Sequence, residues 1–105
     1  MNNIIGVISQ NVIKTLNLEL EKDTPIFIGE SNIEHMKNRH PEDYSKYGKD
    51  IEKIIKNPTY LARDERKNSI VYIREYIVDN EMILVVVKAT GNNKYFVRTM
   101  YTMSK

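Results

Sequence analysis

Both histidines of this chain, His35 and His40, lie in the eight-residue stretch Glu34–Pro41. Imidazole is the side chain whose unperturbed pKa lies nearest to neutrality, so a pair of imidazoles can supply both a proton donor and a proton acceptor. Lys37 and Arg39 lie between the histidines and add fixed positive charge that can bind an anion. These residue types at this spacing favour phosphodiester chemistry. The alternative is a pair of exposed helix residues without a catalytic role.

The composition excludes several classes of protein. The chain has 105 residues and no cysteine, which excludes disulfides, thiolate nucleophiles and thiolate zinc sites. That length is typical of one domain, and we expect residues 1–105 to form it. The longest apolar stretch, Met82–Val87, has the length of a strand and not of a membrane span. We therefore expect a cytoplasmic protein that does not associate with a membrane.

Signals for a cofactor or a metal ion are weak in this sequence. The four glycines are isolated from one another, which is not the pattern of a phosphate-binding loop. His35 and His40 lack the helical spacing of the zinc metalloproteases, and no dense group of carboxylates accompanies them. The sequence therefore predicts a protein that works without a cofactor or a metal ion.

The distribution of charge is more informative than its total. Sixteen basic and fourteen acidic residues give a net charge of only +2. No acidic residue follows Glu81, whereas Lys88, Lys94, Arg98 and Lys105 do. This asymmetry predicts a locally positive surface in the C-terminal part of the chain, which suits a nucleic-acid partner. An ordinary solvated surface is the alternative.

Helical periodicity predominates before Pro58. Apolar residues recur at helical spacing across residues 9–20 and again across residues 41–57, so we expect a helix in each range. The second of these helices should be bent or interrupted at Gly48. Between the two ranges, Pro25–Gly29 is a short apolar run bounded by breakers and is expected to form a buried strand.

A further helix is expected around the histidines. Ser31–Glu34 has the form of a capping box, which predicts a helix that begins at Asn32. The helix should end near Arg39, because the residue before a proline is pushed out of helical geometry. Pro41 can open the next helix at its first turn. His40 is therefore predicted to lie at a junction between two helices.

Strand patterns follow Pro58. Three segments rich in Val, Ile, Tyr and Thr are expected as strands: Ser69–Val78, Met82–Thr90 and Lys94–Met103. They are separated by turn-forming residues at Asp79–Asn80 and Gly91–Asn93, and Thr59–Ala62 can add a short strand. We expect these strands to form an antiparallel meander. The predicted class is α+β, with helices before Pro58 and the meander after it.

Two assignments of the last strand stay open. Strict alternation places one set of residues on each face: Tyr95, Val97, Thr99, Tyr101 and Met103 on one, and Phe96, Arg98, Met100 and Thr102 on the other. With the first set outward, the hydroxyls and rings of Tyr95, Thr99 and Tyr101 could bind single-stranded RNA beside Lys88 and Lys94. With the second set outward, Arg98 becomes the groove residue. Ordinary strand composition is the alternative explanation for the tyrosines and threonines.

Three segments, taken together and in this order, resemble the phage and mobile-element branch of the barnase/EndoU/colicin/RelE-like nuclease superfamily: Ile33–Tyr44, Ile54–Tyr60 and Tyr95–Tyr101. The resemblance covers roughly residues 25–103. It implies a compact α+β fold in which N-terminal helices pack on a four- to five-stranded antiparallel sheet. It also implies an enzyme that cuts RNA without a metal ion.

The resemblance further implies the residues of the site. The histidines of the family match His35 and His40, its basic strand residue matches Arg98, and its small hydroxyl residue matches Thr99. A metal-free ribonuclease needs a base for the 2′-hydroxyl, an acid for the 5′-oxygen and a cation for the phosphorane, and two histidines and an arginine fill these roles. The residues expected to bind the RNA are Lys37, Arg39, Lys88, Tyr95 and Tyr101.

Two other functions remain open at this stage. The same fold without catalysis could be an RNA- or protein-binding module, which explains the C-terminal cations but leaves the histidines unused. A protein of a mobile element could also bind an inhibitor or another partner protein through the exposed side of the helix at residues 9–20, which an apolar patch there would favour. Convergence of His35, His40, Arg98 and Thr99 on one cleft favours the enzyme.

Overall fold

The computed structural model describes residues 3–91 and 94–104, with the side chain of Ser104 left out. The elements in chain order are β1 (Asn3–Ile8), α1 (Gln10–Leu16), β2 (Thr24–Ile28), α2 (Glu30–Arg39), α3 (Pro41–Tyr47), the 3₁₀ turn η1 (Gly48–Asp50), α4 (Ile51–Lys56), β3 (Tyr60–Asp64), β4 (Ser69–Tyr76), β5 (Glu81–Ala89) and β6 (Tyr95–Ser104). Asn92 and Asn93 of the predicted turn, and Lys105 of the basic C-terminal group, lie outside the described residues.

The described strands form a six-stranded sheet in the order β1-β2-β6-β5-β4-β3. From β3 to β6 neighbouring strands are antiparallel, which confirms the predicted meander after Pro58. β2 joins the other edge of β6 in parallel, with Ile26 opposite Tyr95, and β1 pairs antiparallel with β2. The α+β class is confirmed, but the expected sheet is wrong in detail. The sheet is mixed, it has more strands than expected, and the helices are interspersed among the strands.

The strand β1 was missed because its pattern is not that of a regular strand. Its register passes from Ile4 opposite Phe27 to Gly6 opposite Ile26, so Ile5 is an extra residue in a β-bulge. A bulge breaks the two-residue alternation from which a strand is recognised, and a glycine inside a strand weakens the pattern further. The run at Pro25–Gly29 has no such interruption, and the predicted strand is confirmed as β2.

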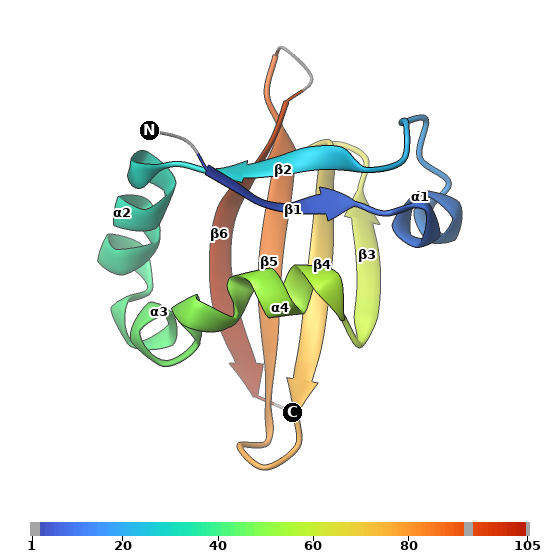
Figure 1. Cartoon of the computed structure of the whole chain (residues 1–105). Coiled ribbons are helices and arrows are strands. Elements are labelled where there is room, and N and C mark those ends of the chain that lie inside the picture. The colour runs from blue at the N-terminus through green and yellow to red at the C-terminus, as the bar shows by residue number, and fades with distance from the viewer. Residues whose placement is uncertain (1–2, 92–93, 105) are drawn as a thin grey trace.

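The core lies between α4 and one face of the sheet. In Figure 1, α4 crosses in front of the strands of the meander. Ile51, Ile54 and Ile55 of α4 are buried in one cluster with inward residues of the strands. The strand residues of this cluster include Ile70, Tyr72, Ile83, Val85, Val87, Val97 and Met100. Burial of each aliphatic side chain stabilises the fold by about 1.5–3 kcal/mol, so the cluster holds α4 on the meander.

The other helices lie at the two sides of the sheet. α2 and α3 stand beside β6, and α1 stands beside β3 (Figure 1). The face of the meander that points away from α4 is therefore left without a covering helix among the described residues; we call it the outer face. Half-buried residues such as Val71, Ile73 and Val86 lie on it, opposite in alternation to the core residues.

Local chemistry sets the ends of α2. The helix begins at Glu30 and not at the predicted Asn32, because the side chain of Asn32 itself caps the helix. Its Oδ1 accepts a hydrogen bond from the backbone N–H of Gly29 at 2.8 Å. The predicted end at Arg39 and the predicted start of the next helix at Pro41 are both confirmed.

The predicted interruption at Gly48 is confirmed. α3 ends before this residue, and a 3₁₀ turn leads into α4. A Cβ atom at position 48 would lie 3.0 Å from the ring of Tyr44, so a side chain there would have to displace that ring. The first predicted helix is shorter than expected and ends at Leu16, because Asn17 adopts a left-handed conformation with φ of 54°.

A tyrosine network ties α3 to the turn between β4 and β5. The hydroxyl of Tyr47 donates to Asp79 Oδ2 at 2.8 Å and lies 3.0 Å from Glu81 Oε1. Burial, and then the bond to Asp79, raise the pKa of Tyr47 to about 12. Lys46 Nζ lies 3.1 Å from the same Glu81 oxygen, and the ring of Tyr76 packs on Tyr47 with centroids 4.9 Å apart. The helical layer and the hairpin tip are thus joined by polar as well as apolar contacts.

Two tyrosine-to-phenylalanine substitutions are expected to have opposite effects on stability. Tyr47→Phe should lower the free energy of unfolding by about 1–3 kcal/mol, because it removes a hydrogen bond to a charged group. Tyr72→Phe should leave that free energy unchanged or raise it, because the buried Tyr72 hydroxyl has no hydrogen-bond partner among the described residues. Urea unfolding measures both. Equal destabilisation by the two variants contradicts the prediction.

Candidate active site

A β-bulge in β6 sets which residues face outward. Val87 pairs with Val97, and the next residue of β5, Val86, pairs with Thr99. Arg98 is therefore an extra residue without a partner in β5, and it is exposed. Bulges re-aim side chains at the edges of functional sites, and this one turns a guanidinium out of the ladder.

The bulge also shifts the alternation of the strand by one residue. Tyr95 and Val97 are buried in the core before the bulge, and Met100 is buried in the core after it. Neither of the two strict alternations is therefore right, because the core takes odd positions first and even positions afterwards. Tyr95 is only 6% exposed, so its assignment to an RNA-binding face is corrected. Tyr101 is opposite Leu84 and stays on the outer face.

A cleft of about 390 Å³ opens between the start of α2 and the neighbouring ends of β5 and β6. It is lined by Asn32, Lys88, Ala89, Thr90, Phe96 and Arg98. Lys88 and Arg98 bring two positive charges to it, and no acidic residue is among the lining residues. The ring of Phe96 lies 5.5 Å from that of Phe27, which gives the cleft an aromatic wall. Cations beside an aromatic wall suit a phosphate and the base attached to it. We call this the basic cleft.

One flank of α2 lies on the side of the basic cleft. Asn32, His35 and Arg39 recur at intervals of three and four residues, so they share one flank of the helix. Because Asn32 lines the cleft, the exposed side chains of His35 and Arg39 lie on the same side of the helix. Met36 is fully buried and fixes the rotation of the helix against the core. His35 and Arg39 thus share a flank of α2 with Asn32, but His35, Arg39, His40 and Thr99 are not among the residues that line the cleft.

His40 lies farther along β6, at the junction of α2 and α3. Its ring centroid is 6.0 Å from that of Tyr101. The junction is anchored to β6 because Asp43 accepts hydrogen bonds from the N–H of Thr102 at 3.1 Å and from its hydroxyl at 3.0 Å. His40 is half-buried and keeps access to solvent. Its imidazole therefore lies beside Tyr101, a residue of the outer face.

Thr99 lies between Arg98 and Tyr101 along β6. Its Oγ1 is buried and makes no hydrogen bond within the part of the chain that the structure describes. A buried hydroxyl without a partner is uncommon, because the cost of removing it from water is not offset. In the present rotamer the hydroxyl does not reach the surface, so contact with a phosphate requires rotation about χ1.

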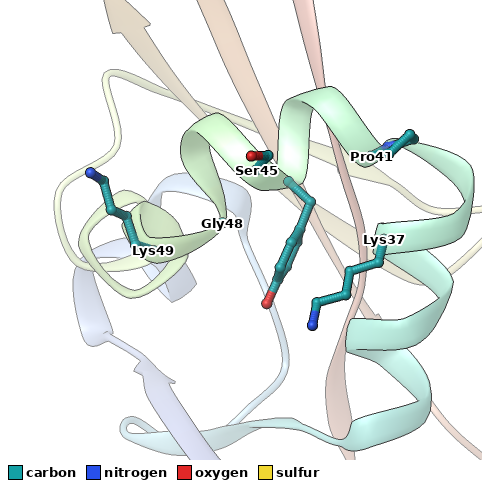
Figure 2. A pocket seen from close by; sticks show the side chains of 6 residues that line it. Lys37, Pro41, Ser45, Gly48 and Lys49 are labelled. Atoms are coloured by element: carbon teal, nitrogen blue, oxygen red, sulfur yellow. The ribbon is translucent and has the colours of Figure 1, made fainter.

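Lys37 lies on the other flank of α2 and does not line the basic cleft. It borders a separate hollow between α2 and α3, together with Ser45 and Lys49 (Figure 2). Its Nζ is 5.8 Å from the centre of the Tyr44 ring, close enough for a cation–π contact. The structure therefore separates Lys37 from the two cations of the basic cleft.

Sequence reasoning did not single out four of the residues that line the basic cleft: Asn32, Ala89, Thr90 and Phe96. Asn32 was read as the first helical residue, although its spacing from His35 was a signal that the two share a flank. Phe96 could be assigned to the outer face only once the position of the bulge was known.

The exposed side of α1 is polar. Its exposed residues are Gln10, Asn11, Lys14 and Thr15, and Val12 is buried. The apolar patch that would favour a partner protein on this helix is therefore not found there.

Residues 3–91 and 94–104 contain neither a cluster of metal-ligating side chains nor a helix that could span a membrane. No group of three or more His, Asp or Glu side chains in them could hold a metal ion. None of the helices in these residues has the length and apolar character needed to cross a membrane.

Comparison with known proteins identifies the family. A family model described as phage-Barnase-EndoU-ColicinE5/D-RelE like nuclease3 matches residues 2–105. No curated protein and no solved structure matches the chain. The family match covers nearly the whole chain, in agreement with the resemblance carried by the three segments of the sequence. The chain belongs to this phage-associated family of barnase-, EndoU- and RelE-like nucleases.

Proposed function

We propose that this nuclease is a metal-independent endoribonuclease that cleaves RNA by attack of the 2′-hydroxyl on the adjacent phosphate. The 2′-oxygen forms a bond to phosphorus, the bond from phosphorus to the 5′-oxygen breaks, and the products are a 2′,3′-cyclic phosphate and a 5′-hydroxyl. One proton leaves the 2′-oxygen, and one proton is given to the 5′-oxygen. His35 and His40 are the base and the acid in this proposal, and each such group typically supplies 10²–10⁴-fold in rate.

The observation that carries the proposal is the bulge at Arg98. It exposes a guanidinium in the basic cleft beside Lys88, on the same side of α2 as His35. A guanidinium donates two parallel hydrogen bonds to a phosphate, and its attraction grows as negative charge develops on the phosphorane. Thr99 follows Arg98 in the strand and is proposed to position the phosphate. Arg39 and Tyr101 extend the surface along which the RNA is bound.

The chemistry of the cleavage is tested with a single-stranded RNA that carries a fluorophore and a quencher. We expect cleavage in the presence of EDTA, a 2′,3′-cyclic phosphate on the upstream product, and no cleavage when the scissile nucleotide is 2′-deoxy. Mass spectrometry of the products identifies the end groups. Loss of activity with EDTA, or cleavage of the 2′-deoxy substrate, contradicts the proposed mechanism. Binding without cleavage of any RNA favours the non-catalytic module in its place.

RNA binding is expected to weaken steeply as the salt concentration rises, because each phosphate contact releases a counterion. Lys88→Ala should weaken binding of every RNA sequence to a similar degree and reduce the slope of log K against log salt by about one contact. Fluorescence anisotropy at several salt concentrations measures both effects, with the 2′-deoxy RNA to prevent turnover. An unchanged slope for Lys88→Ala contradicts binding through the basic cleft.

A further inference from the structure

The strand β1 is an edge strand without the usual protection of an edge. It is the first strand of the sheet order, so its outer edge pairs with no other strand among the described residues. Asn3–Ile8 contains no charged residue and no proline. Ile4 is 61% exposed and Val7 is 41% exposed. Natural proteins cover or charge such an edge, because its free N–H and C=O groups can pair with another chain.

The strand β3, at the opposite edge of the same sheet, is protected against pairing with another chain. β3 carries Arg63 and Asp64 near its end, and α1 packs beside it. The guanidinium of Arg63 donates to the backbone oxygens of Leu16 at 3.4 Å and Asn17 at 3.3 Å, which ties the C-terminal end of α1 to this edge. Each edge strand therefore has a helix packed beside it, α1 beside β3 and α4 beside β1, but β3 carries charged residues and β1 carries none.

A groove of about 700 Å³ runs between β1 and α4. Its floor is narrow at Gly6, where a Cβ atom would lie 3.1 Å from Ile55 Cγ2. The exposed side chains of Ile4 and Val7 belong to its apolar wall. The groove thus has an apolar wall on the side of β1, and the unpaired edge of this strand borders it. These are the features of a site to which an extended peptide adds as a further strand.

The rim of this groove on the helix side is basic. Lys49, Lys53 and Lys56 line it at helical spacing, and all three are exposed. Glu52 is the exposed acid beside them. Asp50 also lines the groove, but it accepts a hydrogen bond from the hydroxyl of Tyr76 at 2.9 Å. An incoming strand would therefore meet an apolar wall on one side and an excess of ammonium groups on the other.

We propose that the β1–α4 groove binds an extended segment of a partner protein in which apolar side chains alternate with acidic ones. The segment pairs with β1 through its backbone, its apolar side chains contact Ile4 and Val7, and its carboxylates face the lysines of α4. A second copy of this chain does not fit, because β1 carries no acidic residue and pairing would bring two basic rims together. A nucleic acid would contact the lysines but would leave the apolar wall of Ile4 and Val7 without a partner. The site is separate from the basic cleft.

The proposal is tested with a fluorescein-labelled dodecapeptide in which Val or Thr alternates with Glu, and with its Lys-for-Glu counterpart. We expect the acidic peptide to bind the full chain and to shift the amide NMR signals of β1 and α4, and the basic peptide not to bind. Two further peptides carry N-methyl groups on alternate residues, one set at odd and one at even positions. Strand addition uses the N–H groups of one set only, so one of the two methylated peptides should lose binding and the other should keep it.

Matched charge reversals locate the site. Lys53→Glu should weaken binding of the acidic peptide about tenfold, because a carboxylate then faces the carboxylates of the peptide. Lys22→Glu makes the same charge change at an exposed lysine outside the groove and should leave the affinity unchanged. No binding, equal binding of both methylated peptides, or signal shifts outside β1 and α4 overturns the proposal. Shifts of the same signals by RNA alone, or by concentration of the protein alone, overturn it in favour of those occupants.

Discussion

Replacing His35 by alanine is expected to lower the rate of RNA cleavage by roughly 10²–10⁴-fold, because it removes a proton-transfer group from the transition state. His35 is exposed on the cleft side of α2, and its ring is not part of the core. The substitution should therefore leave the fold intact, and a surface change of this kind typically alters stability by less than about 0.5 kcal/mol. A lower rate in this variant then reflects the missing proton-transfer group and not a loss of folded protein.

The measurement is the single-turnover rate at saturating protein, taken across the pH range. A general acid or base contributes one limb of a bell-shaped pH–rate profile, so His35→Ala should remove one limb and leave the other. Glu34→Ala is the matched control, because Glu34 is the preceding exposed residue of the same helix and points away from the cleft flank. If His35→Ala cuts RNA as fast as the wild type with both limbs retained, the assignment is wrong.

His40 requires a different substitution because its side chain also contributes to packing at the junction of α2 and α3. It joins α2 to α3 and contacts the ring of Tyr101, so an alanine there changes packing as well as chemistry. His40→Gln keeps a polar side chain of similar length but cannot exchange a proton near neutrality. A loss of rate in this variant with an unchanged midpoint of unfolding separates the two contributions. The single-turnover rate of His40→Gln is measured in the same assay as that of His35→Ala.

The elements that sequence reasoning predicted well are those with an unbroken local pattern. The meander, the end of α2 at Arg39 and the interruption at Gly48 depend on alternation, on proline and on glycine, which act within a few residues. The strand β1 and the faces of β6 depend on bulges at Ile5 and Arg98. The position of a bulge depends on how the strand pairs with its partner and packs on the core, so the sequence of one strand alone does not predict it.

The same reason limits what could be predicted of the site. The histidines, Arg98 and Lys88 were predicted as site residues from residue type and charge, which need no fold. That Lys88 and Arg98 share a cleft with Asn32 could be known only from the fold, because the basic cleft joins α2 to β5 and β6 across more than fifty residues of sequence. The bulge at Arg98 also explains why Tyr95 was misassigned. It shifts the alternation of β6 by one residue, so that Tyr95 lies in the core and Arg98 is exposed.

Removal of the Arg98 guanidinium is expected to cost a rate factor comparable to that of a histidine. Mutagenesis of a single group that stabilises developing charge typically costs about 10²–10³-fold in kcat, and Arg98→Ala should fall in this range. Arg98→Lys should restore only part of the rate, because an ammonium keeps the charge but not the planar pair of donors. Lys14→Ala removes one exposed positive charge from α1, at the other side of the sheet, and controls for the change in net charge.

The separate effects of the Arg98 substitutions on KM and on kcat decide the role of Arg98. A group that contacts the phosphate equally in the ground state and the transition state raises KM when it is removed and leaves kcat unchanged. A group that stabilises the phosphorane lowers kcat, and this is the result expected here. Because the Arg98 side chain is exposed and is not part of the core, the midpoint of unfolding should stay near that of the wild type when it is replaced. An unchanged kcat with a raised KM would make Arg98 a binding residue and leave the phosphorane to another cation, of which Lys88 is the one in the same cleft.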